Sequence, residues 1–221
     1  ISSLIMLFIG AFSDAWAPNA FQLLNENSRH KEIFSKVATM WIMVLSLVTI
    51  FMILFAGEIL AMVATSEFQA AGKVVPILVI SNFMLGTTQF TVLGISIVKK
   101  SKLISKYSWM VAVLNIVLNF VFIPQLGAMG AAIATTIANT ILTFVYLYRS
   151  QKEFFIPYEY KICGAVIILT LFVAILFLNF NDVGFMEKIL VFILFFLGFG
   201  ALFFDKFKYF QSLKSSKIII K

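Results

Sequence analysis

The stretch Val37–Ile59, VATMWIMVLSLVTIFMILFAGEI, decides the fold class of this chain of 221 residues. A helix needs about 20 mostly apolar residues to cross the hydrocarbon core of a membrane, and this stretch is long enough. A β-barrel strand, by contrast, is about 10 residues long and alternates in polarity. Since backbone groups in lipid must bond internally, the stretch predicts a transmembrane helix.

Six further stretches have the same character, and 62% of all residues are hydrophobic. Only 12% of the residues are charged, against about 25% in ordinary soluble domains. The sequence therefore predicts an all-α, polytopic membrane bundle of about seven transmembrane helices. The predicted spans are Ser3–Leu24, Val37–Ile59, Val74–Val98, Leu103–Ile123, Ala128–Tyr148, Ile162–Asn179 and Lys188–Phe204.

The spans differ in composition along the chain. The last two are nearly all aliphatic residues and Phe, which predicts that they face lipid. We divide the chain into five core spans over residues 1–148, two peripheral transmembrane helices over 149–204 and a basic tail over 205–221.

Lys and Arg residues are distributed unevenly over the connecting segments. Of the 17, 15 fall in four segments that alternate with the others, at residues 29–36, 99–106, 149–161 and 206–221. Short loops rich in Lys and Arg stay cytoplasmic, so we expect these segments and the C-terminus inside. The net charge of +7 is then explained by topology and by anionic headgroups, without a nucleic-acid partner.

An odd number of spans places the two ends of the chain on opposite sides of the membrane. The chain opens at Ile1 inside an apolar stretch, without the basic leader and cleavage site of a signal peptide. From both observations we expect that an N-terminal part of the protein is missing from this sequence.

Polar residues recur at helical spacing within three of the predicted spans, where i, i+3, i+4 and i+7 positions share a face. They either line a hydrated cavity or form hydrogen bonds that only hold neighbouring helices together. Three such stripes on consecutive spans favour the cavity. The candidate residues are Asn82, Gly86 and Gln89, flanked by Thr87, Thr88 and Thr91, then Asn115 and Asn119, then Thr135, Asn139 and Thr143.

Asp14 is the one ionisable residue predicted to lie in the middle of a span. An Asp there costs about 2.5–3.5 kcal/mol on insertion scales, so it is expected to face the protein interior. It is a candidate proton, cation or ligand site, or else an Asp paired with a polar neighbour or placed nearer the interface. Pro18, four residues on, predicts a kink that exposes a carbonyl near Asp14.

Small residues cluster at the start of the fifth span, where they allow close helix packing. The packing candidates are Gly127, Gly130, Ala131 and Ala134. A single cysteine, Cys163, excludes an internal disulfide and a Cys-based metal site. The connections are too short for a soluble catalytic domain, so we expect no metal, no cofactor and no enzymatic activity.

Residues Asn115–Thr135 read NIVLNFVFIPQLGAMGAAIAT. This stretch resembles the hallmark of the polysaccharide-repeat flippases, N-x-x-L-N-x-x-x-I-P-x-x-G-x-x-G-A-A-x-A-T, at every fixed position. These Wzx-type exporters of O-antigen and capsule units belong to the multidrug/oligosaccharidyl-lipid/polysaccharide exporter superfamily. The Ala15–Pro18 step and the Lys99–Lys102 turn resemble the family too. The resemblance covers essentially the whole chain, as the C-terminal half of such a protein.

The resemblance implies a fold of 12 or 14 spans in two lobes, of which this chain would be the C-terminal lobe. It implies a bacterial inner-membrane transporter that moves a lipid-linked oligosaccharide of the undecaprenyl diphosphate type to the outer leaflet. A coupling ion, H⁺ or Na⁺, is left open. One departure is that this half has no Arg or Lys in the middle of a span to meet the diphosphate.

Three other functions are weighed against this one. A drug or cation antiporter of the same superfamily would share the fold but should carry more acidic residues within its lobes than Asp14. A membrane-embedded glycosyltransferase or polymerase would need a large loop, or clustered carboxylates and His for metal and acid–base work. A purely structural subunit would not need polar stripes on three helices.

Overall fold

The computed structural model describes the chain except for residues 1, 27, 64–71, 73, 180–183 and 216–221. The described residues form helices and no strands, and seven helical segments are long and apolar enough to cross a membrane. The predicted all-α class with seven spans is confirmed. The helices are α1 Ser2–Glu26, α2 His30–Leu54, α3 Ala56–Val63, α4 Val75–Thr91, α5 Leu93–Ile97, α6 Ser101–Leu126, α7 Ala128–Glu153, α8 Tyr160–Asn179 and α9 Phe185–Ser215.

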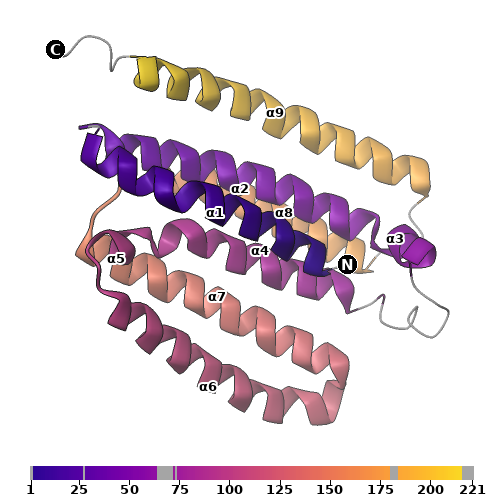
Figure 1. Cartoon of the computed structure of the whole chain (residues 1–221). Helices are drawn as coiled ribbons and strands as arrows, with labels where there is room; N and C mark the ends of the chain where they lie inside the picture. The colour runs from indigo at the N-terminus through magenta and orange to yellow at the C-terminus, as the bar shows by residue number, and fades with distance from the viewer. Residues whose placement is uncertain (1, 27, 64–71, 73, 180–183, 216–221) are drawn as a thin grey trace.

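The long helices run back and forth side by side, with α6 at one edge of the bundle and α9 at the other (Figure 1). Between these edges, α7 packs on α6 and α4, and α4 packs on α1 and α2. Both α8 and α9 pack on α2. At the start of α9, Lys188 Nζ lies 2.7 Å from Glu58 Oε1 of α3. Residues 205–215, predicted as tail, continue α9, and residues 216–221 lie outside the described part.

The core is centred on α2, which is the most buried of the spans. Trp41 of α2 stacks on Phe12 of α1 with ring centroids 3.7 Å apart, and its indole Nε1 donates to the Gly86 carbonyl of α4 at 3.0 Å. A Cβ on Gly86 would lie 2.7 Å from Leu45 Cδ2 and 2.9 Å from Ile9 Cδ1. The missing side chain at Gly86 therefore allows α1, α2 and α4 to pack closely together at this point.

The third predicted span is not one helix, which differs from the expectation of a continuous Val74–Val98. It breaks at Val92, between α4 and α5. The Gly94 amide donates to Ser150 Oγ at 2.8 Å, while the Phe90 carbonyl accepts the Tyr158 hydroxyl at 2.7 Å. Since an unbroken helix would join Gly94 N to Phe90 O directly, these two side chains satisfy the groups that the break exposes. Burial raises the pKa of Tyr158, which keeps its hydroxyl a donor.

One carboxylate joins three helices at the end of the bundle where α8 begins. Glu159 Oε1 lies 2.6 Å from Lys36 Nζ of α2 and 2.6 Å from Lys206 Nζ of α9, and Oε2 accepts the Thr39 hydroxyl at 3.0 Å. Partial burial by itself would raise the pKa of Glu159. The hydrogen bonds from Lys206, Lys36 and Thr39 outweigh it and hold this pKa below its ordinary value of 4.5.

We expect Glu159→Gln to destabilise the folded protein by about 1–2 kcal/mol, between an exposed and a buried ion pair. Because the folded pKa lies below the unfolded one, the carboxylate stabilises the fold above about pH 4.5 and loses this effect as the pH falls through the folded pKa. Thermal unfolding in detergent from pH 7 to pH 4 measures this. The matched control is Glu153→Gln, whose partner Lys100 is 54% exposed. Equal loss in both variants would contradict the prediction.

Candidate functional site

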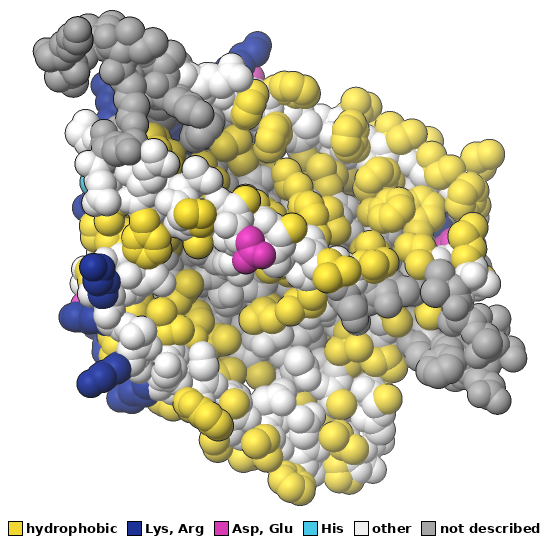
Figure 2. All heavy atoms as spheres, viewed as in Figure 1, with side chains coloured by type: hydrophobic (Ala, Val, Ile, Leu, Met, Phe, Trp, Pro, Cys, Tyr) yellow, Lys and Arg dark blue, Asp and Glu magenta, His cyan; other side chains and the backbone are white. Residues whose placement is uncertain are grey.

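The exposed side of α1 carries polar residues although the helix is long enough to span a membrane, and it also carries the apolar side chains of Leu4, Met6, Leu7 and Phe21. Asp14 lies midway along α1, and further exposed polar residues follow it toward the end of the helix. Figure 2 looks onto this side of the bundle and shows acidic atoms well away from the basic edge. We call the exposed residues Asp14, Asn19, Gln22 and Asn25 the α1 polar face.

The α1 polar face cannot lie against lipid without cost. The opposite side of α1 is buried in the bundle through Ile5, Ile9, Trp16 and Ala20. A carboxylate in hydrocarbon costs several kcal/mol, so such residues face other protein or water. Asp14, expected to point into the protein interior, instead points away from the described bundle. The α1 polar face is therefore a surface for more protein or for a hydrated space.

The predicted kink at Pro18 is not reflected in the secondary structure, because α1 is one continuous helix from Ser2 to Glu26. Proline removes one backbone donor, which leaves the carbonyl of Asp14 without its usual helical partner. The next carbonyl along the chain, that of Ala15, accepts a hydrogen bond from Asn19 Nδ2 at 2.6 Å. The middle of α1 thus carries the Asp14 carboxylate and one backbone carbonyl that lacks its helical donor.

The polar residues of the fifth span mostly face α4. Asn139 Nδ2 donates to Ser81 Oγ at 2.9 Å, and the Thr143 hydroxyl donates to the Met84 carbonyl at 2.9 Å. Thr135 bonds within its own helix, to the Ala131 carbonyl at 2.9 Å. These contacts are interhelical and intrahelical hydrogen bonds, which corresponds to the alternative in which polar side chains hold the bundle together. On α4, Asn82 and Gln89 are half-buried.

Asn115 and Asn119 lie on α6, at the edge of the bundle and away from α1 (Figure 1). Asn119 Nδ2 donates to Asn115 Oδ1 at 3.1 Å. The other amide atoms, Asn115 Nδ2 and Asn119 Oδ1, are buried without a hydrogen-bond partner among the described residues. The candidate residues are therefore not gathered in one cavity of this chain. They are distributed over four helices, with Asp14 on α1, Asn82 and Gln89 on α4, Asn115 and Asn119 on α6, and Thr135 and Asn139 on α7.

The small residues of α7 have different roles. A Cβ on Gly130 would collide with the Phe122 carbonyl of α6, with the carbonyl carbon only 2.5 Å away. Ala134 is fully buried and Ala131 half-buried. Gly127, in contrast, is exposed in the turn between α6 and α7, with φ +56° and open space at its Cβ position. A glycine is favoured at this position because it adopts a positive φ without steric strain.

The basic residues gather at one end of the bundle. Figure 2 shows Lys and Arg along its left-hand edge, where α1 ends and α2, α6 and α8 begin (Figure 1). Lys99, Lys100, Lys102 and Lys106 are all exposed there. In the described part of the chain, no three His, Cys, Asp or Glu side chains are grouped closely enough to hold a metal ion.

Sequence reasoning missed Asn19, Gln22 and Asn25 as members of one surface with Asp14. With 3.6 residues per turn, Asn25 lies about 20° from Asp14 around the helix, Gln22 about 80° and Asn19 about 140°, so the spacing indicates a broad exposed side of α1 rather than a narrow stripe. It also missed Ser150 and Tyr158, which close the break in the third span. No local pattern marks those two, because the contacts join segments far apart in sequence.

A comparison with known proteins adds an independent finding. Over 201 residues, the chain is 23% identical to the probable low-salt glycan biosynthesis flippase Agl15 of Haloferax volcanii. This chain is a multi-pass membrane protein similar to a glycan flippase. The match covers 90% of the chain and 43% of the relative, so the chain spans less than half of that protein's length. No family profile and no solved structure matches the chain.

Proposed function

We propose that this chain is the C-terminal lobe of a flippase for lipid-linked oligosaccharides. In this proposal the whole transporter moves an O-antigen or capsular repeat unit, carried on undecaprenyl diphosphate, to the outer leaflet of a bacterial inner membrane. Two lobes open alternately to either side. The similarity to a glycan flippase over 90% of the chain supports the class of transporter. The resemblance of the Asn115–Thr135 motif to the polysaccharide-repeat flippases supports the superfamily, and the cargo is the part that we propose.

The α1 polar face is the structural observation that carries the proposal. It runs from Asp14, midway along the span Leu4–Asn25, to the end of that span, on the exposed side of a bundle whose other walls are largely apolar. A second lobe opposite α1 would enclose it as a hydrated passage. Amide and carboxylate groups suit sugar hydroxyls, which both donate and accept hydrogen bonds. The lipid tail of the cargo stays in the membrane beside the passage.

The orientation follows from the charges. The basic end of the bundle lies in the cytoplasm, with α9 ending there and the C-terminus inside. Membrane lipids with anionic headgroups contact its exposed lysines. The cationic groups that meet the diphosphate come from the other lobe, or from Lys99 and Lys100 at this edge. Asp14 is the candidate site for a coupling ion, H⁺ or Na⁺.

Asp14 also favours a second function, that of a drug or cation antiporter of the same superfamily. A carboxylate midway along a span is a suitable site for exchanging a proton with a cation. The polar face would then bind a cationic drug rather than a sugar. The two functions share the fold, and they are separated by what the protein transports.

Complementation distinguishes them. A strain that lacks its own oligosaccharide flippase receives the full-length protein, and surface polysaccharide is measured by gel staining and by antibody. We expect surface polysaccharide to return. The matched control is Gly130→Ala, expected to lower the amount of folded protein and the signal together. If the strain gained drug resistance without surface polysaccharide, the antiporter would replace the flippase.

A further inference from the structure

We infer a binding site for one acyl chain of an anionic phospholipid between α7 and α8, on the side of the bundle away from α1. The site is a pocket of about 300 Å³. Its wall comes from four helices, α2, α4, α7 and α8. Residues that represent them are Ile42, Met84, Phe90, Leu147, Gly164 and Ile168.

The pocket wall is apolar although several polar residues contribute to it. The hydroxyls of Thr87 and Thr143 both donate to the Met84 carbonyl, at 2.6 and 2.9 Å. The Tyr158 hydroxyl donates to the Phe90 carbonyl at 2.7 Å. These polar atoms are already bonded, and Thr91 Oγ1, which has no hydrogen-bond partner among the described residues, is buried, so the side chains turn carbon atoms toward the pocket. The ligand is therefore hydrocarbon rather than a sugar or an ion.

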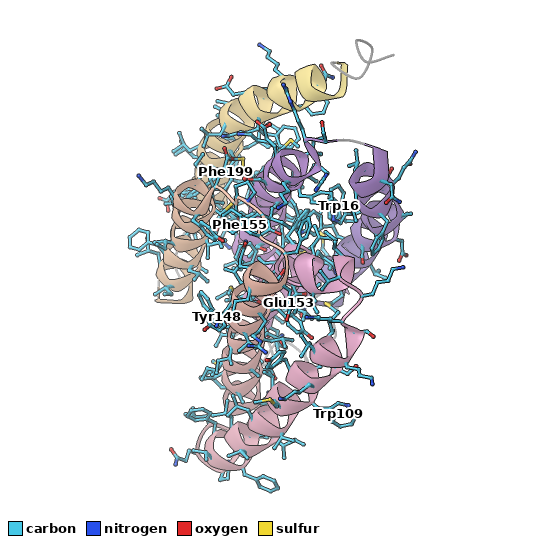
Figure 3. All side chains as sticks on the ribbon, turned by 90° about the vertical axis from the view of Figure 1, so that its left-hand side faces the viewer. Trp16, Trp109, Tyr148, Glu153, Phe155 and Phe199 are labelled. Atoms are coloured by element: carbon cyan, nitrogen blue, oxygen red, sulfur yellow. The ribbon has the colours of Figure 1, made fainter. Side chains whose placement is uncertain are left out.

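The opening of the pocket faces the membrane. Both α7 and α8 line it, but α7 packs mainly on α4 and α6 and α8 packs mainly on α2, so the two helices are not closely packed on one another. The side chains at the rim are exposed and apolar, with Phe144 at 62% and Ile168 at 69%. Seen from the basic end of the bundle in Figure 3, Tyr148 of α7 lies on the opposite side from Trp16 of α1. The pocket is thus separate from the α1 polar face.

The size of the pocket favours occupation by a lipid chain. Apolar protein cavities of roughly 150 Å³ stay dry and take up guests the size of benzene. This pocket has about twice that volume and opens sideways to hydrocarbon. An empty space would leave its wall without dispersion contacts, which a chain from the surrounding bilayer supplies.

Charge at the rim selects the headgroup. Lys152 in the last turn of α7 and Lys161 in the first turn of α8 are both exposed, next to the segments that line the pocket. Lys152 Nζ lies 4.4 Å from the centre of the Tyr148 ring, at the end of the bundle where basic residues gather. A chain in the pocket leaves its headgroup at this end, and the two lysines favour a negative one.

Filling the pocket tests the inference. Gly164 lines it, and a Cβ there would meet no atom within 4 Å, so Gly164→Leu adds a side chain at the pocket wall without a clash at its Cβ. The matched control is Gly198→Leu on α9, also with open space at Cβ but outside the pocket. The full chain, delipidated in detergent, is titrated with phosphatidylglycerol and analysed by native mass spectrometry. We expect the parent and Gly198→Leu to retain a phosphatidylglycerol that Gly164→Leu loses.

A second variant tests the headgroup. Replacing Lys152 and Lys161 together by Gln should abolish the preference for phosphatidylglycerol over phosphatidylcholine while still allowing either lipid to bind. Three results would overturn the inference. They are equal retention by Gly164→Leu and Gly198→Leu, no retained lipid in the parent chain, and displacement of the phospholipid by an equimolar polyprenyl phosphate, which would make the pocket a site for a carrier lipid.

Discussion

Gly130→Ala is expected to destabilise the bundle by about 1–3 kcal/mol, the usual cost of overpacking a close contact. The added Cβ would collide with the Phe122 carbonyl and lie 2.5 Å from its carbon, so backbone rather than a flexible side chain would have to move. The α6–α7 pair would separate. Since α6 packs mainly on α7, the loss of this contact frees α6 from the rest of the bundle. Thermal unfolding in detergent, followed by size-exclusion chromatography, measures the effect.

Gly198→Ala is the matched control for this substitution. Gly198 lies in α9 with no atom within 4 Å of a Cβ position. Alanine favours helix over glycine by about 1 kcal/mol, so this variant should be neutral or more stable. The two glycines therefore respond to the same substitution with opposite signs. A Gly130→Ala protein as stable as the parent would show that α6 and α7 do not approach closely at Gly130.

The Asn115–Thr135 motif can be explained largely by the α6–α7 hairpin. Gly127 adopts the positive φ of the turn, and Gly130 permits the close approach to Phe122. Asn115 and Asn119 bond to one another along α6. Each of these features concerns how two helices meet. The motif therefore indicates a fold more directly than a cargo, and the α1 polar face is the better place to look for cargo contacts.

The number and order of the spans could be predicted because length and hydropathy alone decide them. Each of the seven predicted spans overlaps a helix of membrane-spanning length. The break at Val92 could not be predicted in this way, because it depends on Ser150 and Tyr158, which are more than fifty residues away. The apolar composition of residues 74–98 gives no sign of the break, because side chains from distant segments bond to the backbone groups that the break exposes.

The polar residues show the same limit. Helical spacing correctly groups Asn139 and Thr143 on one side of α7, but spacing does not say what that side meets. The structure answers this with Ser81 and the Met84 carbonyl of α4. For Asp14, spacing indicates on which side of α1 the residue lies, and the cost of a carboxylate in lipid predicts that this side meets protein or water. In the structure this side is turned away from the bundle, and no pattern within α1 says what it meets there.

Asp14→Asn is expected to reduce transport strongly while leaving the folded protein intact. The side chain is exposed and makes no ion pair with the described residues, so the bundle does not need its charge. If the carboxylate binds the cargo or a coupling ion, losing one charged contact of about 1.4 kcal/mol lowers transport about tenfold. Surface polysaccharide in the complemented strain gives the rate, and chromatography confirms equal amounts of folded protein.

Asp205→Asn on α9 is the control, since Asp205 is also exposed but lies near the basic end of the bundle. It should transport like the parent, and Asp14→Glu, which keeps the charge, should recover part of the activity. A tenfold loss restricted to Asp14→Asn places the α1 polar face on the transport path. If Asp14→Asn and Asp205→Asn transport equally well, the carboxylate has no part in transport, and the α1 polar face is not the cargo path that we propose.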